Sequence, residues 1–233
     1  MFDLNFFIKI LLTVIEHIPI SLYITFISLL IGCIIALPVA IARFYRVPIL
    51  DPLFKFIITI LQGTPTVLIL LVVYLYSSNF IVTLIKDYQL NFRFRDINTS
   101  IFAIFSFSLL CFARASEIFR SALMSIDLGQ FEAGEAFGFT KKQLFKKIIF
   151  PQMIPTIIPQ LSNLVMGLLK GSSLVILIGI VDMLNSAVIL ANKNYRFFEA
   201  YFGVALIYWL LCIIIGWIFD KIEIRYRYMY RSE

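Results

Sequence analysis

The chain has 233 residues, a length that suits one or two soluble domains, but its composition excludes a soluble fold. Hydrophobic residues make up 61% of the chain and charged residues 15%, against about 45–50% and about 25% in typical soluble domains. We therefore predict an all-α integral membrane protein. The formal net charge of +6 then indicates basic residues that flank membrane segments, and not a nucleic-acid-binding surface.

Uncharged runs in the sequence locate five membrane-spanning helices. A helix needs about 20 apolar residues to cross about 30 Å of hydrocarbon. The predicted spans cover residues 18–42, 56–78, 97–117, 157–181 and 200–219, within a single transmembrane domain at 18–220. Prolines at 151, 155 and 159 predict that the fourth helix proper starts near Pro159.

The two ends of the chain differ in character. Residues 1–17 place polar side chains on one narrow helical stripe, which predicts an amphipathic helix in the membrane interface; the alternative is that they extend the first span. Residues 221–233 form a basic tail. With the N-terminus outside, inner segments hold 13 Lys and Arg residues and outer segments six, so the bias predicts an outer N-terminus and a cytoplasmic C-terminus.

The sequence offers little chemistry for catalysis. One histidine and three cysteines in apolar surroundings do not make a metal site, and no Gly-Lys dipeptide occurs, so the chain has no phosphate-binding Walker A loop. If ATP drives this protein, another polypeptide binds it. A membrane-embedded enzyme would need a cluster of catalytic residues that the sequence does not display.

The loop at 127–151, the longest predicted on the inner side, carries a helical pattern of its own. Residues 131–137 form a short predicted helix, and Gly138 stands where that helix ends. Thr140 and Gln143 have the spacing of a capping box at the start of an amphipathic helix. Such a helix at the cytoplasmic surface can transmit force from a soluble partner.

Charged and polar residues inside the predicted spans have two interpretations each. Arg114, Glu117 and Arg120 recur every three residues and form either an internal ion-pair ladder or, at Arg114 or Glu117, a contact with substrate. Lys170 is either paired or faces a water-filled cavity.

Small residues and a proline mark two further positions in the predicted spans. The run Gly171-Ser172-Ser173 serves close helix packing or lines a polar path. We predict a break in the second span at Gly63, Thr64 and Pro65. Such a break serves either gating or static packing.

The loop also carries a recognisable signature. It resembles the EAA motif of ABC importer permeases at Glu132, Ala133, Gly134, Gly138, Ile149 and Pro151. Segments 62–65, 116–123 and 168–174 resemble the polar amino-acid branch of that family, in the same order and over essentially the whole chain. Three positions depart from the pattern: Gly134 stands where the signature has its second alanine, Gly171 where an Asp is frequent, and Arg114 where an aromatic or neutral residue is usual.

The resemblance implies a type I permease with a five-helix core, an N-terminal interfacial helix and a cytoplasmic coupling helix. It implies a subunit that is not an enzyme, sits as a multi-pass protein in the bacterial inner membrane and moves polar amino acids by alternating access. The implied partners are a second permease (a copy or a paralogue), two cytoplasmic ATPases that bind ATP and Mg, an external solute-binding protein and membrane lipid. The chain itself holds no cofactor. The alternatives are an ion channel or passive pore, or a permease for a different small polar solute.

Overall fold

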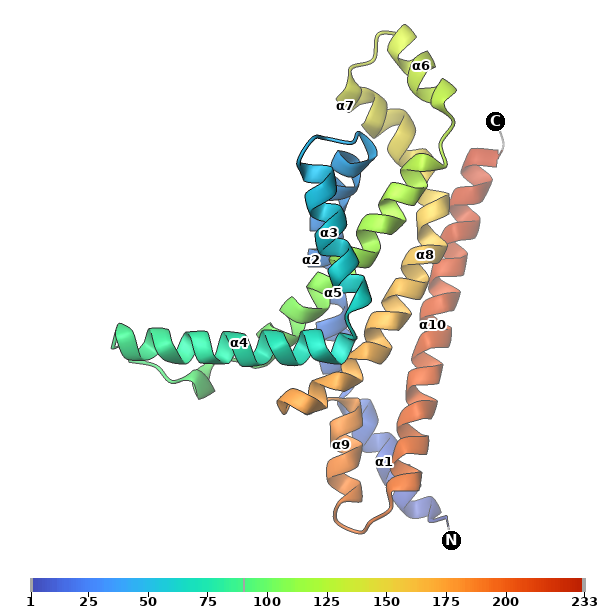
Figure 1. The fold of residues 1–233 in the computed structure, drawn as a ribbon. Coiled ribbons are helices and arrows are strands. Elements are labelled where there is room, and N and C mark those ends of the chain that lie inside the picture. The colour runs from blue at the N-terminus through green and yellow to red at the C-terminus, as the bar shows by residue number, and fades with distance from the viewer. Residues whose placement is uncertain (1, 90, 232–233) are drawn as a thin grey trace.

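The computed structural model describes residues 2–89 and 91–231, and in this part of the chain helices joined by short loops are present and strands are not (Figure 1). The membrane environment favours this outcome, because a helix satisfies its backbone hydrogen bonds within itself. The elements in order are α1 (Leu4–Glu16), α2 (Ile18–Phe44), α3 (Leu50–Gly63), α4 (Thr66–Asp87), η1 (Phe94–Asp96), α5 (Ser100–Met124), α6 (Leu128–Ala136), α7 (Lys141–Leu144), η2 (Phe145–Ile149), α8 (Phe150–Gly171), η3 (Ser172–Ile178), α9 (Met183–Ala191) and α10 (Phe197–Arg231).

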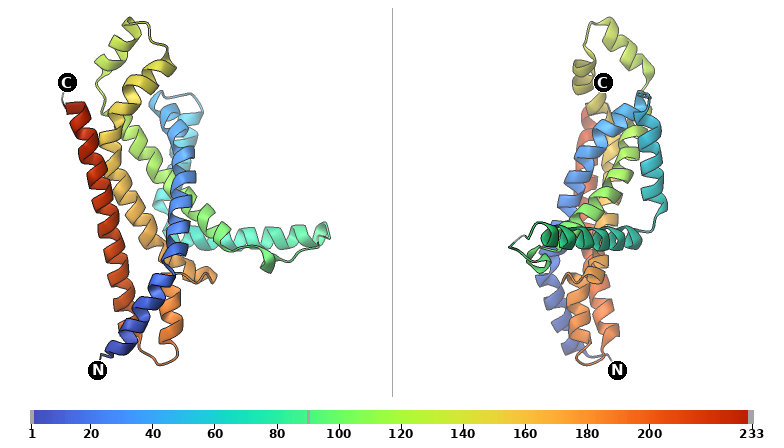
Figure 2. Two further views of the ribbon diagram at one scale, coloured as in Figure 1. Left: turned by 180° about the vertical axis from the view of Figure 1, so that it is seen from behind. Right: turned by 60° about the vertical axis from the view of Figure 1, so that its left-hand side comes forward.

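Five segments are long and apolar enough to cross a membrane, which is the predicted number. They are Leu4–Phe44, Thr66–Asp87, Ser100–Met124, Lys141–Ile178 and Phe197–Tyr226. Helix α6 and the C-terminal end of α10 lie at one end of the bundle, and the N-terminus lies at the opposite end (Figures 1 and 2).

Helix α1 packs against α9 and α10, with Phe6, Ile10 and Val14 buried. The side chain of Asp3 caps its start by accepting a hydrogen bond from the amide of Phe6. A single residue, His17, separates α1 from α2, and the two helices form one apolar stretch. This continuity is the arrangement expected if residues 1–17 extend the first span. Their location in the membrane interface stays a prediction.

The predicted break in the second span is confirmed. Helix α3 ends at Gly63, and α4 begins at Thr66 and runs crosswise away from the bundle (Figures 1 and 2). Thr64 is extended, with φ −95° and ψ 131°, because the ring of Pro65 disfavours the helical conformation for the residue before it. Helix α4 itself buries only Ile69 and Leu70.

Helix α8 starts earlier than the prolines predict. It begins at Phe150 and continues through Pro155 and Pro159 to Gly171. Pro151 fits its first turn, where no amide donor is needed. The later prolines are accommodated, as they commonly are in membrane helices, where neighbouring groups satisfy the freed carbonyls. After Gly171 the helix continues as the tighter 3-10 helix η3. Gly179, with φ +79°, caps the end of η3.

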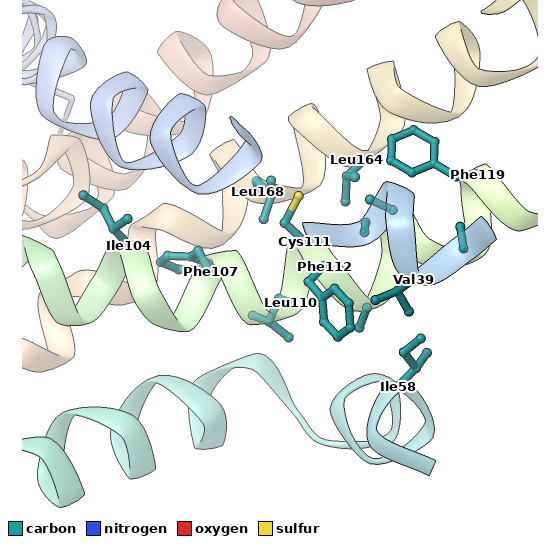
Figure 3. Close-up of a cluster of buried hydrophobic side chains, with 14 of the residues drawn as sticks. Val39, Ile58, Ile104, Phe107, Leu110, Cys111, Phe112, Phe119, Leu164 and Leu168 are labelled. Carbon is teal, nitrogen blue, oxygen red and sulfur yellow. The ribbon is translucent and has the colours of Figure 1, made fainter. Parts of the chain in front are cut away.

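The core is centred on the packing of α2 against α5 (Figure 3). Gly32 of α2 lies directly on α5: a Cβ atom there would stand 2.5 Å from Cβ of Cys111 and 2.9 Å from the backbone nitrogen of Phe112. Small residues of this kind let two membrane helices approach backbone to backbone. This contact fixes α5, the helix that carries the charged residues discussed below.

We predict that Gly32→Ala lowers the stability of the purified protein, because the added methyl meets α5 backbone and overpacking costs about 1–3 kcal/mol. The control is Gly216→Ala in α10, where a Cβ meets nothing within 4 Å and alanine gains about 1 kcal/mol of helix propensity. Thermal unfolding in detergent compares the two variants. Equal melting temperatures would contradict the close contact.

Candidate functional site

Helix α6 and the corner after it form the first part of the candidate site. Asp127 caps the helix, and its Oδ1 accepts a hydrogen bond of 2.6 Å from the amide of Gly129. The helix ends at a left-handed Gly138, with φ +78°, as the sequence predicts. The amide of Phe139 then donates to the carbonyl of Gly134 at 3.1 Å. The glycine therefore reverses the chain direction without leaving helix carbonyls unpaired.

The predicted capping box follows this corner. The Thr140 amide donates to Oε1 of Gln143 at 3.0 Å, and the Gln143 amide donates to Oγ1 of Thr140 at 3.3 Å. Helix α7 then passes through the π-helical turn η2 into α8. Ile149 is fully buried at the end of this turn. Motif residues Ile149 and Pro151 thus join the loop to the membrane bundle, while Glu132 and Ala133 are exposed.

Helix α6 has one face against its own chain and one face open. A Cβ atom on Gly134 would overlap Cδ1 of Leu144 in α7, so the small residue serves an internal contact. Phe131 stacks on Phe44 of α2, with ring centroids 5.8 Å apart. On the open face the Phe137 side chain is 84% exposed, and Leu128 is exposed as well. The sequence analysis did not identify these two residues. The available signal was Phe137, an apolar residue directly before the glycine that ends a helix outside the membrane spans.

Glu117 lies at the centre of an ion-pair network in the C-terminal part of α5. Its carboxylate is 2.5 Å from Nη1 of Arg43 and 3.0 Å from Nη2 of Arg120. Arg43 also lies 3.6 Å from Asp51, and its side chain is only 6% exposed. These contacts favour the structural interpretation of Glu117 and bring in Arg43, which the sequence did not single out. Arg114 does not join this network.

Arg114 lies on another face of α5 and lines two cavities. The larger, of about 290 Å³, is also lined by Gln160 and Asn163 of α8. The smaller, of about 50 Å³, is lined by Thr66 at the start of α4 and by Gly167. Nη1 of Arg114 would be 3.5 Å from a Cβ atom on Gly167, so the guanidinium lies against α8 where the glycine leaves room.

Helix α8 presents a polar face toward this region, made of Gln160, Asn163, Gly167 and Lys170. Their spacing of three, four and three residues puts them on one side of the helix. Asn163 and Lys170 are exposed in the single chain. Polar residues in a membrane helix face the bundle interior or water, so this face is the candidate lining of a path. The sequence analysis identified Lys170 but not Gln160 and Asn163. The available signal was that both amide residues are spaced from Lys170 so as to share its helix face.

The remaining candidates lie beside this face or along the chain from it. The hydroxyl of Ser172 donates to the carbonyl of Leu169 at 2.7 Å, and that of Ser173 to the carbonyl of Lys170 at 2.8 Å. These bonds favour the packing interpretation for both serines.

The break that contains Gly63, Thr64 and Pro65 is tied to α5. Nε2 of Gln62 donates to the carbonyl of Ala113 at 3.1 Å, one residue before Arg114. The Thr64 hydroxyl donates to the carbonyl of Ile60 at 2.7 Å within its own helix. A change in the angle at the break would therefore move the wall of the Arg114 cavities.

These features define a class. The chain is a helical membrane protein in which a short capped helix, α6, is followed by α7 and η2 and then by α8, the helix that bears a polar face. Among residues 2–89 and 91–231, no three His, Cys, Asp or Glu side chains gather in a way that could hold a metal ion.

The chain belongs to the family of binding-protein-dependent transport system inner membrane components, which matches residues 28–228. It is 34% identical to the probable amino-acid permease protein YxeN of Bacillus subtilis over 95% of this chain and 94% of that protein. It is 31% identical to the L-cystine transport system permease protein TcyL of the same organism, over 96% and 91%. It is also 31% identical to the arginine ABC transporter permease protein ArtQ of Escherichia coli, over 72% and 76%.

Solved structures share the fold. A chain from the crystal structure of an amino acid ABC transporter with histidines superposes with a TM-score of 0.79 at 25% identity, over 97% of this chain and 99% of that one. A chain of the inward-facing MetNI methionine ABC transporter gives 0.74 at 19% identity, over 92% and 96%. The protein is thus a permease subunit of an ABC importer and not an enzyme or a passive pore; ATP hydrolysis belongs to a separate subunit.

We predict that Glu117→Gln destabilises the protein by about 2–3 kcal/mol, because Arg43 loses its closest counter-charge while buried. The double variant Arg43→Met/Glu117→Met should recover most of this loss, since apolar residues replace both charges. Arg114→Gln should leave the melting temperature unchanged. If Arg114→Gln were as destabilising as Glu117→Gln, Arg114 would belong to the structural network.

Proposed function

We propose that this chain forms half of a permease dimer that imports polar amino acids, driven by two cytoplasmic ATPases that bind ATP and Mg. The second half is a copy or a close relative, and an external solute-binding protein delivers the substrate. The observation that carries the proposal is α6, a capped helix that offers exposed apolar and acidic side chains at one end of a membrane bundle. The amino-acid permeases among the relatives support the substrate class.

Helix α6 is proposed to dock in a groove of the ATPase. Phe137 is the anchor, since an exposed aromatic side chain gains much of its contact energy when a partner buries it. Glu132 and Ala133 contribute charge and close approach. Movement of α6 would pass to α8 through the Gly134–Leu144 contact and η2, because packed helices move together as rigid elements. ATP binding supplies the free energy that favours one conformation.

The polar face of α8 and Arg114 are proposed to line the substrate path between the two permease subunits. In the single chain Arg114, Asn163 and Lys170 are exposed, and Gln160 is partly buried. Charged and amide groups inside a membrane require water or a partner. Helix α4, which buries so little against its own bundle, is proposed to contact the second subunit. The break at Thr64 and Pro65 would then act as a hinge, which corresponds to gating, one of the two roles that the sequence leaves open for it.

The orientation that fits this assembly puts α6 and the C-terminus in the cytoplasm and the N-terminus outside, in the inner membrane of a bacterium. The excess of Lys and Arg in the predicted inner segments supports it. So does the position of α6 and the end of α10 at the same end of the bundle.

Gly138→Val tests the coupling role. Valine at φ +78° is strained, which costs at least about 1–2 kcal/mol and turns the chain after α6 in a different direction. We expect loss of ATPase co-purification and of substrate-stimulated hydrolysis, with Phe137→Ala weakening both. Gly138→Asn is the matched control, because asparagine tolerates the left-handed conformation. Normal coupling in Gly138→Val would remove the ground for calling α6 a coupling helix.

Labelling of introduced cysteines tests the orientation. A membrane-impermeant thiol reagent applied outside intact cells should modify Asn91→Cys and spare Lys142→Cys, which becomes reactive only after the membrane is opened. The reverse pattern would overturn the proposed topology.

A further inference from the structure

We infer that the cavity beside Arg114 binds the carboxylate of acidic or neutral amino acids and rejects amino acids with a cationic side chain. This inference rests on the proposed function, because it assigns a charge preference to the path proposed there. The relatives do not settle this preference, since those named above include an L-cystine and an arginine permease.

The guanidinium of Arg114 is available, in contrast to other arginines near the ends of the bundle. Arg43 and Arg120 are held by Glu117, and Arg196 lies 2.7 Å from Asp3. Arg114 has no ion-pair partner among the described residues, and its side chain lines both cavities. An arginine binds a carboxylate with two parallel hydrogen bonds, which suits an amino-acid carboxylate entering the larger cavity.

The charges around the cavities all have one sign. No acidic side chain is among the described residues that line either cavity. The nearest acidic side chain along α5, Glu117, is already bound to two arginines. Lys170 lines neither cavity, but it lies on the polar face of α8 between Leu168 and Gly171, which line the smaller one, and so adds a second positive charge nearby. A lysine or arginine substrate would therefore bring a third positive charge into a path inside the membrane without a counter-charge.

Neutral acceptors remain for the substrate ammonium group. Nε2 of Gln160 donates to the carbonyl of Thr156 at 3.1 Å, which leaves Oε1 of that amide as an acceptor at the cavity. The exposed amide of Asn163 provides another. Amide oxygens can hold an ammonium group that every amino acid carries, but they do not compensate an additional cationic side chain.

The experiment measures binding of radiolabelled glutamate, glutamine and lysine to the complete permease–ATPase complex in detergent, without the external solute-binding protein. Omitting that protein removes its own selectivity from the result. We expect glutamate and glutamine to bind at least tenfold more tightly than lysine. Arg114→Gln should weaken glutamate binding at least tenfold, Arg114→Lys should weaken it less, and Arg114→Glu should shift the preference toward lysine. Lys193→Gln, which removes an exposed charge away from the cavities, should bind as the unaltered complex does.

Two results overturn the inference while leaving amino-acid import intact. One is equal binding of lysine and glutamate by the unaltered complex, and the other is unchanged glutamate binding in Arg114→Gln. Failure of all three amino acids to bind would contradict the proposed function itself, together with the charge preference. The comparison within the unaltered complex requires no variant to fold.

Discussion

A charged or amide group inside a membrane must find a partner or water, and this constraint separates the residues proposed to line the substrate path from those that stabilise the fold. Arg43, Glu117 and Arg120 form ion pairs with one another beside the C-terminal part of α5. Arg114 lies only three residues from Glu117, yet its guanidinium turns to α8 and has no acidic partner among the described residues. The same helix thus carries one group of charges that stabilises the fold and one charge that remains available to a ligand.

The scaffold makes this separation possible through two backbone features. Close packing at Gly32 fixes α5 against α2, so the charged face of α5 has a defined direction. The extended conformation at Thr64 and Pro65 ends α3 and turns α4 crosswise away from the bundle, with Thr66 at the smaller Arg114 cavity. A continuous helix there would carry Thr66 elsewhere. The position of the Arg114 cavities therefore depends on Gly32 and Pro65.

Local rules predicted much of the architecture. Hydropathy gives the number of spans, because the length of an apolar helix is set by the membrane. The break before Pro65, the left-handed Gly138 and the capping box of Thr140 are each decided by neighbours in sequence, and each is present. The signature in the coupling loop pointed to the family that the comparisons establish.

Contacts between residues far apart in the sequence could not be predicted from these local patterns. Nothing local links Arg43 to Glu117, which are 74 residues apart, so the ladder proposed for Arg114, Glu117 and Arg120 was only partly present. Gly134, a residue of the EAA signature, packs against Leu144 of its own chain, a contact that the signature does not reveal. The prolines of α8 predicted a late start, whereas tertiary packing and the membrane keep the helix continuous from Phe150. Gln160 and Asn163 gain meaning only when α8 is placed beside Arg114.

The central claim is that one face of α8 lines a water-filled path, and cysteine accessibility along that helix tests it most directly. Single cysteines at Gln160, Asn163, Gly167 and Lys170 are compared with cysteines at the buried positions Ile158, Val165 and Leu169. The assembled transporter in lipid nanodiscs is treated with a charged thiol reagent, and labelling is measured above that of the native cysteines. The account predicts rapid labelling at the first four positions and slow labelling at the other three. Uniform labelling, or none at the first four positions, would contradict it.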